Sequence, residues 1–155
     1  MLRIQVPRFE TSSSRSASRI LSSVKSTDTK CETQLRSELW RMGLRFRKNL
    51  QDLPGKPDIV FTKQRLVVFC DGDFWHGRDW LARKRRLNKG ANAMYWTKKI
   101  HANIQRDRSH DKELRQLGWK VLRLWESEIL IDPHRCALSV VEIVRSNPSD
   151  PASGC

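Results

Sequence analysis

The chain has 155 residues, of which 38% are hydrophobic and 30% are charged, and this is the size and balance of one globular domain. We expect neither a membrane span nor a secretory leader, because no run approaches about 18 consecutive apolar residues and the N-terminus lacks an apolar segment. The formal net charge of +13 favours an anionic partner. Because the positive charge extends through the body of the chain, we expect nucleic acid as that partner.

The cysteines, at positions 31, 70, 136 and 155, form no CxxC pair and no spacing typical of a disulfide framework. We therefore expect free thiols in a reducing cytoplasm. The six tryptophans are many for this length. In a basic protein, surplus aromatic residues could stack on bases or wedge between them.

The first segment, residues 1–26, is rich in serine, carries scattered arginines and has little material for a core. We expect a flexible basic arm with one short helical turn. Two interpretations stay open: a solvated tail, or an arm that lies on nucleic acid through Arg15 and Arg19. A folded domain is expected over residues 27–145, followed by a disordered tail over residues 146–155.

The folded domain is expected to begin with a helix and a hairpin. Thr29 and Glu32 form a capping box, and apolar residues follow at helical spacing up to Gly43. Two short apolar runs, 58–61 and 66–70, are separated by a turn. They predict an antiparallel hairpin in the middle of a sheet.

The second half of the domain is expected to alternate helix and strand. Residues 78–89 are predicted to form a basic loop, and a long helix follows over about 93–117. Apolar and polar residues alternate enough over 119–125 to predict a third strand. An Asp-Pro pair predicts a last helix over about 132–144. Together these elements predict an α/β domain with a mixed sheet.

Acidic residues lie where the hairpin strands meet at one end of the sheet. Asp58 opens the first strand, and Asp71 follows Cys70 at the end of the second. Adjacent antiparallel strands can bring such carboxylates close together. Converging carboxylates beside a basic surface suit Mg²⁺, which prefers oxygen ligands and can clamp a phosphate and activate a bound water. For Asp58 taken alone, a turn with a solvated aspartate is the open alternative.

The loop after the second strand carries aromatic side chains and a histidine. Phe74 and Trp75 follow the Asp71-Gly72 turn directly, where packing alone explains two large aromatic residues poorly. His76 has an ordinary pKa near about 6.5 and could take a proton from an attacking water. A surface or hydrogen-bonded histidine is the alternative.

Motifs along the chain match one family in order and spacing: Leu53 to Asp58 (LPGKPD), Phe69 to Gly77 (FxDGDFWHG), Tyr95 to Ile100 (YWxxKI), Asn103 to Asp107 (NIxRD) and Leu117 to Glu126 (LGWxVL, then WE). Through these residues the sequence resembles the very-short-patch-repair (Vsr) endonucleases over about residues 15–144. The resemblance implies the PD-(D/E)xK-type, restriction-endonuclease-like fold, a mixed sheet flanked by helices. It also implies a Mg²⁺-dependent enzyme that nicks DNA 5′ of the thymine in T·G mismatches, which arise when 5-methylcytosine deaminates at the target site of a cytosine-5 methyltransferase.

The resemblance implies roles for the acidic residues and the histidine by position. Asp58 would be the central Mg²⁺ ligand, Cys70 would offer its backbone carbonyl to the metal, and His76 would be the general base or water-orienting residue. Glu32 lies where the family has a helical carboxylate near the metal-bound waters. The role of capping-box carboxylate is an equally open alternative for Glu32.

Other positions are implied in DNA contact or in support of the site. Phe74, Trp75 and Trp96 fall on the aromatic positions that wedge into the duplex beside the mismatch, while core packing stays open for Trp96. Asn103 and Asp107 lie on the same side of the long helix and suggest a buried polar network behind the site. The basic segment supplies further candidates for phosphate contact, namely Arg83, Lys84, Arg85, Arg86 and Lys89.

Two departures from the family pattern matter. Where the best-known members carry histidine, this chain has Asp71, and we predict that Asp71 joins Asp58 as a metal ligand. Those members also hold a structural zinc through Cys and His. At the matching positions this chain has residues without a thiolate or an imidazole, namely Asp73, Arg78, Trp80 and Ser127. Since structural zinc needs such ligands, we expect no zinc here and expect packing by Trp80 to hold that region.

The sequence therefore predicts a Mg²⁺-dependent, mismatch-directed DNA nicking enzyme, a monomer acting on double-stranded DNA in the bacterial cytoplasm and associated with the nucleoid. A non-catalytic binder of mismatched or bent DNA explains the charge and the aromatic residues equally well. It does not explain the acidic residues beside His76, because carboxylates repel phosphate in the absence of a metal. A nuclease of the same fold with another substrate is the third hypothesis, and the aromatic residues argue against it.

Overall fold

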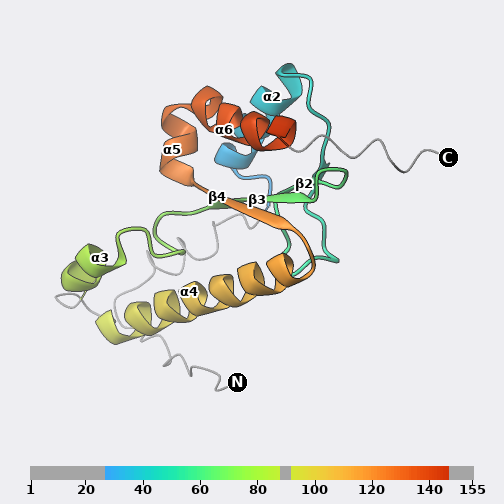
Figure 1. The fold of residues 1–155 in the computed structure, drawn as a ribbon. Coiled ribbons are helices and arrows are strands. Elements are labelled where there is room, and N and C mark those ends of the chain that lie inside the picture. Colours follow the sequence, from blue (N-terminus) through green and yellow to red (C-terminus); the bar gives the residue numbers. More distant parts are fainter. Residues whose placement is uncertain (1–26, 88–91, 147–155) are drawn as a thin grey trace.

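A computed structural model describes residues 27–87 and 92–146, which form one sheet between helices (Figure 1). No helix within these ranges is long and apolar enough to cross a membrane. The expected basic arm with Arg15 and Arg19, the tail after Ser146, and Lys89 lie outside the described residues.

The sheet has four strands in the order β1-β2-β3-β4: β1 (Arg47–Lys48), β2 (Ile59–Phe61), β3 (Leu66–Asp71) and β4 (Lys120–Trp125). The β2–β3 pair is the predicted antiparallel hairpin, with Ile59 opposite Val68. The predicted third strand, β4, runs parallel to β3, so that Asp71 lies opposite Trp125. The prediction of a mixed sheet is confirmed, and the short β1 adds an antiparallel edge strand that the sequence pattern did not reveal.

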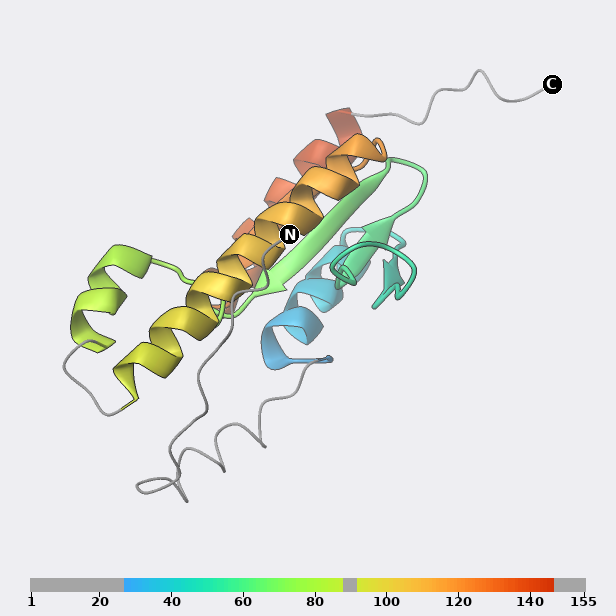
Figure 2. The ribbon, with the colours of Figure 1, turned by 90° about the horizontal axis from the view of Figure 1, so that it is seen from below.

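Helices cover both faces of the sheet (Figures 1 and 2). The long helix α4 (Ala93–Gln116) follows the prediction closely and lies along one face, where Leu114 packs with Val60, Val67 and Phe69. The other face is covered by α2 (Lys30–Arg41), α5 (Glu126–Ile131) and α6 (Pro133–Ser146), which bury the larger core. Because β3 is covered on both faces, its sequence is a near-continuous apolar run.

Helix α2 begins at the predicted capping box. Thr29 is the N-cap, and its hydroxyl accepts a hydrogen bond from the amide of Glu32. The Glu32 carboxylate reaches back and accepts a hydrogen bond from the amide of Asp28, one residue before the cap. These contacts fix the path of the chain into α2 and hold Glu32 at its N-terminal end.

The helical content exceeds the prediction in three places. The expected basic loop over 78–89 is wrong, because Trp80–Leu87 form helix α3 beside the N-terminal end of α4 (Figure 1). Arginine and lysine favour helix, but this segment lacks the apolar repeat through which a sequence reveals one. Helix α5 was also not predicted, since its six residues are too few to show a period. The last helix continues to Ser146, which had been assigned to the tail.

The buried face of α2 leads to a prediction about stability. Leu35 is fully buried in the larger core, whereas Leu81 on α3 is 78% exposed. We expect Leu35→Ala to lower the free energy of unfolding by about 2–5 kcal/mol, because the shortened side chain leaves a cavity. Leu81→Ala is the matched control, with an expected change below about 0.5 kcal/mol. Urea unfolding followed by circular dichroism measures both, and equal small changes would contradict the packing of α2.

Candidate active site

A pocket of about 840 Å³ opens where β2 begins and β3 ends. Acidic side chains from separate elements line it together with a histidine: Glu32, Asp58, Asp71, Glu126 and His76. The topology explains why they converge. The first residues of β2 lie beside the last residues of β3 because the pair is antiparallel, and β4, parallel to β3, ends at the same edge.

Asp58 directly precedes β2, and its carboxylate accepts a hydrogen bond of 2.7 Å from the backbone amide of Cys70. This contact fixes the carboxylate beside the backbone of Cys70. Burial raises the pKa of Asp58 to about 7; the Cys70 amide lowers it, and the negative charges of Glu32 and Asp71 add to the rise. The carboxylate therefore lies where a cation would stabilise its charged form.

Glu32 lines the pocket and is also a capping residue. It is only 2% exposed. Its carboxylate accepts hydrogen bonds from the Asp28 amide at 2.9 Å and the Thr29 hydroxyl at 3.0 Å, and Arg36 lies 3.4 Å away. Glu32 therefore is the capping-box carboxylate that the sequence predicts. A contact of Glu32 with metal-bound water would be a second role of the same side chain.

Asp71 is the buried last residue of β3, and its carboxylate pairs with Arg123 of β4. Nη1 of Arg123 lies 3.0 Å from both carboxylate oxygens of Asp71, and Nη2 donates to Asp111 of α4 at 2.6 Å. Burial raises the pKa of Asp71, and the positive charges of His76 and Arg123 oppose that rise. Arg123 therefore supplies one cation to a buried and a partly buried carboxylate.

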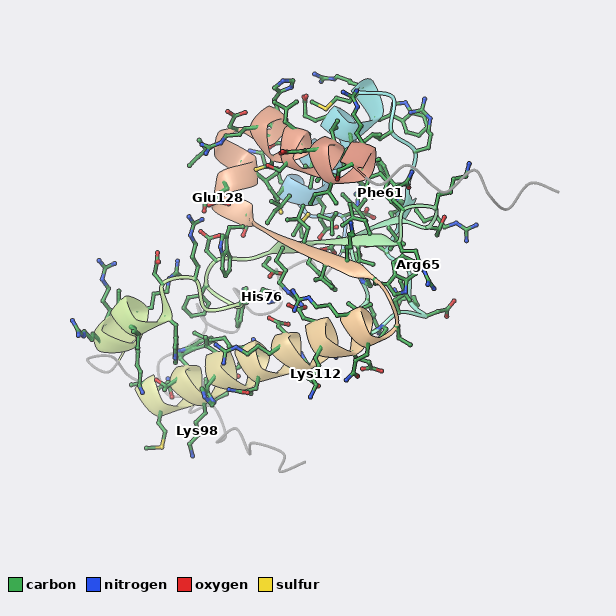
Figure 3. The ribbon with its side chains drawn as sticks, viewed as in Figure 1. Phe61, Arg65, His76, Lys98, Lys112 and Glu128 are labelled. Carbon is green, nitrogen blue, oxygen red and sulfur yellow. The ribbon has the colours of Figure 1, made fainter. Side chains whose placement is uncertain are left out.

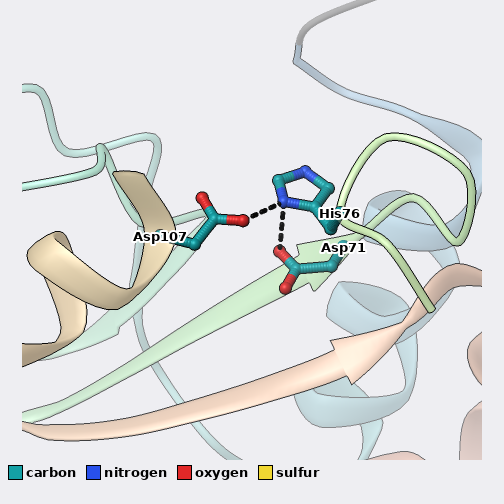
Figure 4. Close-up of side chains that lie close together, drawn as sticks. All are labelled: Asp71, His76 and Asp107. Atoms are coloured by element: carbon teal, nitrogen blue, oxygen red, sulfur yellow. Dashed lines mark hydrogen bonds and ion pairs between the residues drawn. The ribbon is translucent and has the colours of Figure 1, made fainter. Parts of the chain in front are cut away.

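His76 lies between the end of the sheet and α4 (Figures 3 and 4). Its Nδ1 is 2.6 Å from Oδ2 of Asp107 on α4 and 3.8 Å from Oδ1 of Asp71. Burial lowers the pKa of His76, but the hydrogen bond to Asp107 and the charges of both aspartates outweigh this effect, and the pKa is raised. With the proton of the neutral ring on Nδ1, Nε2 is the nitrogen that can accept a proton.

Within the described ranges, Asp71, His76 and Asp107 form a group that could hold a metal ion, with one ligand atom from each inside 4.8 Å. A metal there would compete with the short hydrogen bond between His76 and Asp107. Mg²⁺ prefers oxygen ligands. The predicted set of the Asp58 and Asp71 carboxylates with the Cys70 carbonyl offers oxygen alone. The donor chemistry therefore favours that set for Mg²⁺ and leaves the His76–Asp107 pair intact.

The three aromatic candidates come together in one group, here called the aromatic cluster and consisting of Phe74, Trp75 and Trp96. Their ring centroids are 5.1 Å apart for Phe74–Trp75, 5.5 Å for Phe74–Trp96 and 5.7 Å for Trp75–Trp96. All three side chains are half-buried. Trp96 thus packs with the loop residues, while the two hydrophobic cores are built from other side chains.

The basic candidates of the described chain lie on α3. Lys84, Arg85 and Arg86 are exposed, and the guanidinium of Arg83 lies 6.0 Å from the ring centre of Phe74. Helix α3 therefore places the charge of the half-buried Arg83 near the aromatic cluster and presents three further positive charges to solvent.

Both supporting candidates on α4 contact the loop that follows β3. Asn103 donates a hydrogen bond of 2.9 Å to the backbone carbonyl of Trp75, and Asp107, one turn further along the helix, bonds His76. Because α4 packs on the sheet, it holds the loop in a fixed position relative to β3.

Two residues of the site were missed as candidates in the sequence. Glu126 lines the pocket, and a Cβ built on Gly72 would lie 3.6 Å from its Oε2. Glu126 ends the motif that runs from Leu117, and its place there could have indicated a role in the site. Arg123 was also missed, although its charge within the otherwise apolar run 121–125 of β4 could have indicated a buried partner.

The His76–Asp107 contact predicts a change in histidine ionisation. Asp107→Asn keeps the shape of the side chain but removes its charge, and we expect the pKa of His76 in the metal-free protein to fall. NMR titration of the histidine Cε1–H signals measures it. Asp132→Asn, at an exposed position before α6, is the control and should leave the His76 signal unchanged. An unaltered His76 titration in Asp107→Asn would contradict the contact.

Comparison with known proteins places the chain in a family. The family model described as DNA mismatch endonuclease Vsr matches residues 10–82. The type II nicking enzyme V.NmeDIP of Neisseria meningitidis serogroup C is 43% identical over 125 residues, which are 81% of this chain and 83% of the relative. The type II nicking enzyme V.HpaIIP of Haemophilus parainfluenzae is 36% identical over 79% of this chain and 85% of its own length. The DNA mismatch endonuclease Vsr of Escherichia coli (strain K12) is 37% identical over 70% of this chain and 68% of its own length.

The fold, the pocket and these matches together establish that the chain belongs to the Vsr family of DNA mismatch endonucleases.

Proposed function

We propose that the protein is a Mg²⁺-dependent DNA endonuclease that nicks one strand 5′ of the thymine in T·G mismatches. It acts as a monomer, on mismatches left by deamination of 5-methylcytosine at the target sites of a cognate cytosine-5 methyltransferase. Relatives named as nicking enzymes and as a mismatch endonuclease support DNA cleavage. The observation that carries the proposal is the pocket in which Asp58 is bonded to the Cys70 amide close to the His76–Asp107 pair.

The oxygen donors of the pocket fit Mg²⁺. Asp58, Asp71 and the Cys70 carbonyl would hold the ion, with Glu32 close to its waters. When bound, Mg²⁺ supplies charge stabilisation at the phosphate and lowers the pKa of a bound water. Arg123 already balances part of the charge of Asp71, and the carboxylate retains further lone pairs for a second partner.

His76 is the proposed general base. Asp107 holds the Nδ1 proton and so directs Nε2 toward the reaction as a proton acceptor. When Nε2 takes the proton of the attacking water, the imidazolium that forms lies beside the negative charges of Asp107 and Asp71. These charges stabilise it, which is the physical basis for assigning the base to His76.

The aromatic cluster and α3 are the proposed DNA-binding elements. Lys84, Arg85 and Arg86 would contact phosphates, and such contacts weaken as salt concentration rises. Phe74, Trp75 and Trp96 would enter the duplex between base pairs. A mismatched pair costs less to unstack than a matched pair, so entry at a T·G pair is favoured.

The proposed metal site predicts a strong effect of one substitution. Asp58→Asn removes the carboxylate charge, and we expect it to lower the single-turnover nicking rate on a T·G duplex with Mg²⁺ by more than about a hundredfold. Asp52→Asn, at an exposed aspartate nearby in the chain, is the control and should nick at the wild-type rate. Nicking by Asp58→Asn at that rate would contradict the assignment.

A second experiment tests the substrate. It compares cleavage of two hemimethylated duplexes that differ only in a T·G or a C·G pair at one position, each with Mg²⁺ or with EDTA. We expect a nick on the thymine strand of the T·G duplex with Mg²⁺ alone. Equal cleavage of both duplexes would exclude mismatch specificity and leave a nuclease with another substrate. Binding without cleavage under every condition would leave a non-catalytic DNA-binding protein.

A further inference from the structure

A network of polar contacts surrounds Arg78 at the end of the loop that follows β3. Arg78 Nη1 donates to the hydroxyl of Ser127, and Nη2 donates to Oε1 of Glu128 at 3.1 Å. Nη1 also lies 3.6 Å from Oδ2 of Asp73, and Oδ1 of Asp73 accepts a hydrogen bond from the amide of Ser127 at 3.2 Å. Arg78, Asp73, Ser127 and Glu128 are called the arginine clasp below. The clasp joins two segments that are 49 residues apart in the sequence.

The clasp contains three of the four positions at which the resemblance implies a structural zinc in the best-known members of the family. Of the four matching positions, Asp73, Arg78 and Ser127 contact one another in this structure. Their donors do not fit zinc, because a guanidinium has no lone pair and carries a positive charge, and the set contains neither thiolate nor imidazole. Trp80 occupies the fourth position as the first residue of α3, and the polar contacts of the clasp are made by the other three residues together with Glu128. Packing of this region by Trp80 stays a prediction, and the contacts that the structure shows here form a polar cross-link.

The loop spanned by the clasp carries the proposed functional side chains. Residues 72–79 connect β3 to α3 and present Phe74, Trp75 and His76. On one side α4 holds the loop through its contacts to Trp75 and His76. On the other side the clasp ties it to the start of α5. Since α4 and α5 lie on opposite faces of the sheet, the two sets of contacts anchor different sides of the loop (Figure 1).

Local hydrogen bonds close the loop between these anchors. The amide of His76 donates to the carbonyl of Gly72 at 3.1 Å, and the amide of Arg78 donates to the carbonyl of Asp73 at 3.0 Å. Gly77 has a φ of +72°, and a Cβ there would come within 2.5 Å of the Ile104 side chain on α4. The loop thus follows one tight path whose ends meet at Asp73 and Arg78, the residues that the clasp joins to Ser127.

We propose that Arg78 is a positioning residue whose guanidinium cross-link takes the place of a structural metal and holds the Phe74–His76 loop against α5. A planar guanidinium can direct separate N–H groups at a hydroxyl and a carboxylate at once, whereas an ammonium group is a single point of attachment. The clasp is partly exposed to solvent, with 28% exposure of the Arg78 side chain. Its residues are not part of the larger hydrophobic core, so its role is to position the loop and not to stabilise the core. Only its catalytic consequence rests on the proposed nuclease function.

Hydrogen exchange tests the clasp without reference to activity. In Arg78→Met and in Arg78→Lys, we expect the backbone amides of residues 76 and 78 to exchange at least about tenfold faster than in the wild type. The amides of β3 should stay protected. Ser127→Ala keeps the arginine and removes one acceptor, and it should show the same change in the same amides. Arg145→Met, at an exposed position of α6, is the matched control and should show none. Unchanged loop exchange in Arg78→Met or in Arg78→Lys would overturn the proposal, as would one zinc ion per chain in the purified wild-type protein.

A second arm connects the clasp to the reaction. If the wild type nicks the T·G duplex, Arg78→Met should slow single-turnover nicking about tenfold at saturating protein, whereas Arg145→Met should not. Unaltered nicking by Arg78→Met would overturn the positioning role. If the wild type does not nick, the proposed function fails, and the exchange experiment still decides whether the clasp holds the loop.

Discussion

The hydrogen bond from the Cys70 amide to the Asp58 carboxylate connects the packing of this protein to its proposed chemistry. It requires the β2–β3 register in which Ile59 lies opposite Val68, because that register brings residue 58 alongside the end of β3. A slip by one residue would move Ile59 and Phe61 from the larger core to the face of the sheet on which Val60 packs. Cores on both sides of the sheet resist such a slip. The position of the carboxylate therefore follows from burial of apolar side chains some distance from the pocket.

The carboxylates in and beside the pocket differ in how their charge is balanced. Asp71 has the guanidinium of Arg123, and Asp107 has the imidazole of His76. Asp58 is held by a neutral amide, and burial keeps its pKa near neutral pH, at about 7. A divalent cation would balance the charge of Asp58, whose direct hydrogen-bond partner is a neutral amide. The basic side chains of α3 lie outside this acidic pocket, where they can attract a phosphate backbone without neutralising the site.

Features that depend on local chemistry could be predicted from the sequence, and features that depend on distant partners could not. Capping at Thr29, the hairpin over 58–70 and the long helix α4 each carry a local signal, and all three are present. The helix α3 was missed because its apolar residues are too few to form a repeat. The contacts of Arg123 with Asp71 and of Arg78 with Ser127 join positions 52 and 49 residues apart, and no spacing rule reveals such pairs. The position of Asp71 at the end of β3 could be predicted, but its arginine partner could not.

Crystals soaked in Mn²⁺, with the ion located by its anomalous scattering, would test the central claim most directly. The account predicts one strong peak within coordination distance of the Asp58 carboxylate and the Cys70 carbonyl, with the His76–Asp107 hydrogen bond still formed. The same peak should be absent from crystals of Asp58→Asn. A peak bound by Nδ1 of His76 and by Asp107, or a peak that persists in Asp58→Asn, would contradict the account.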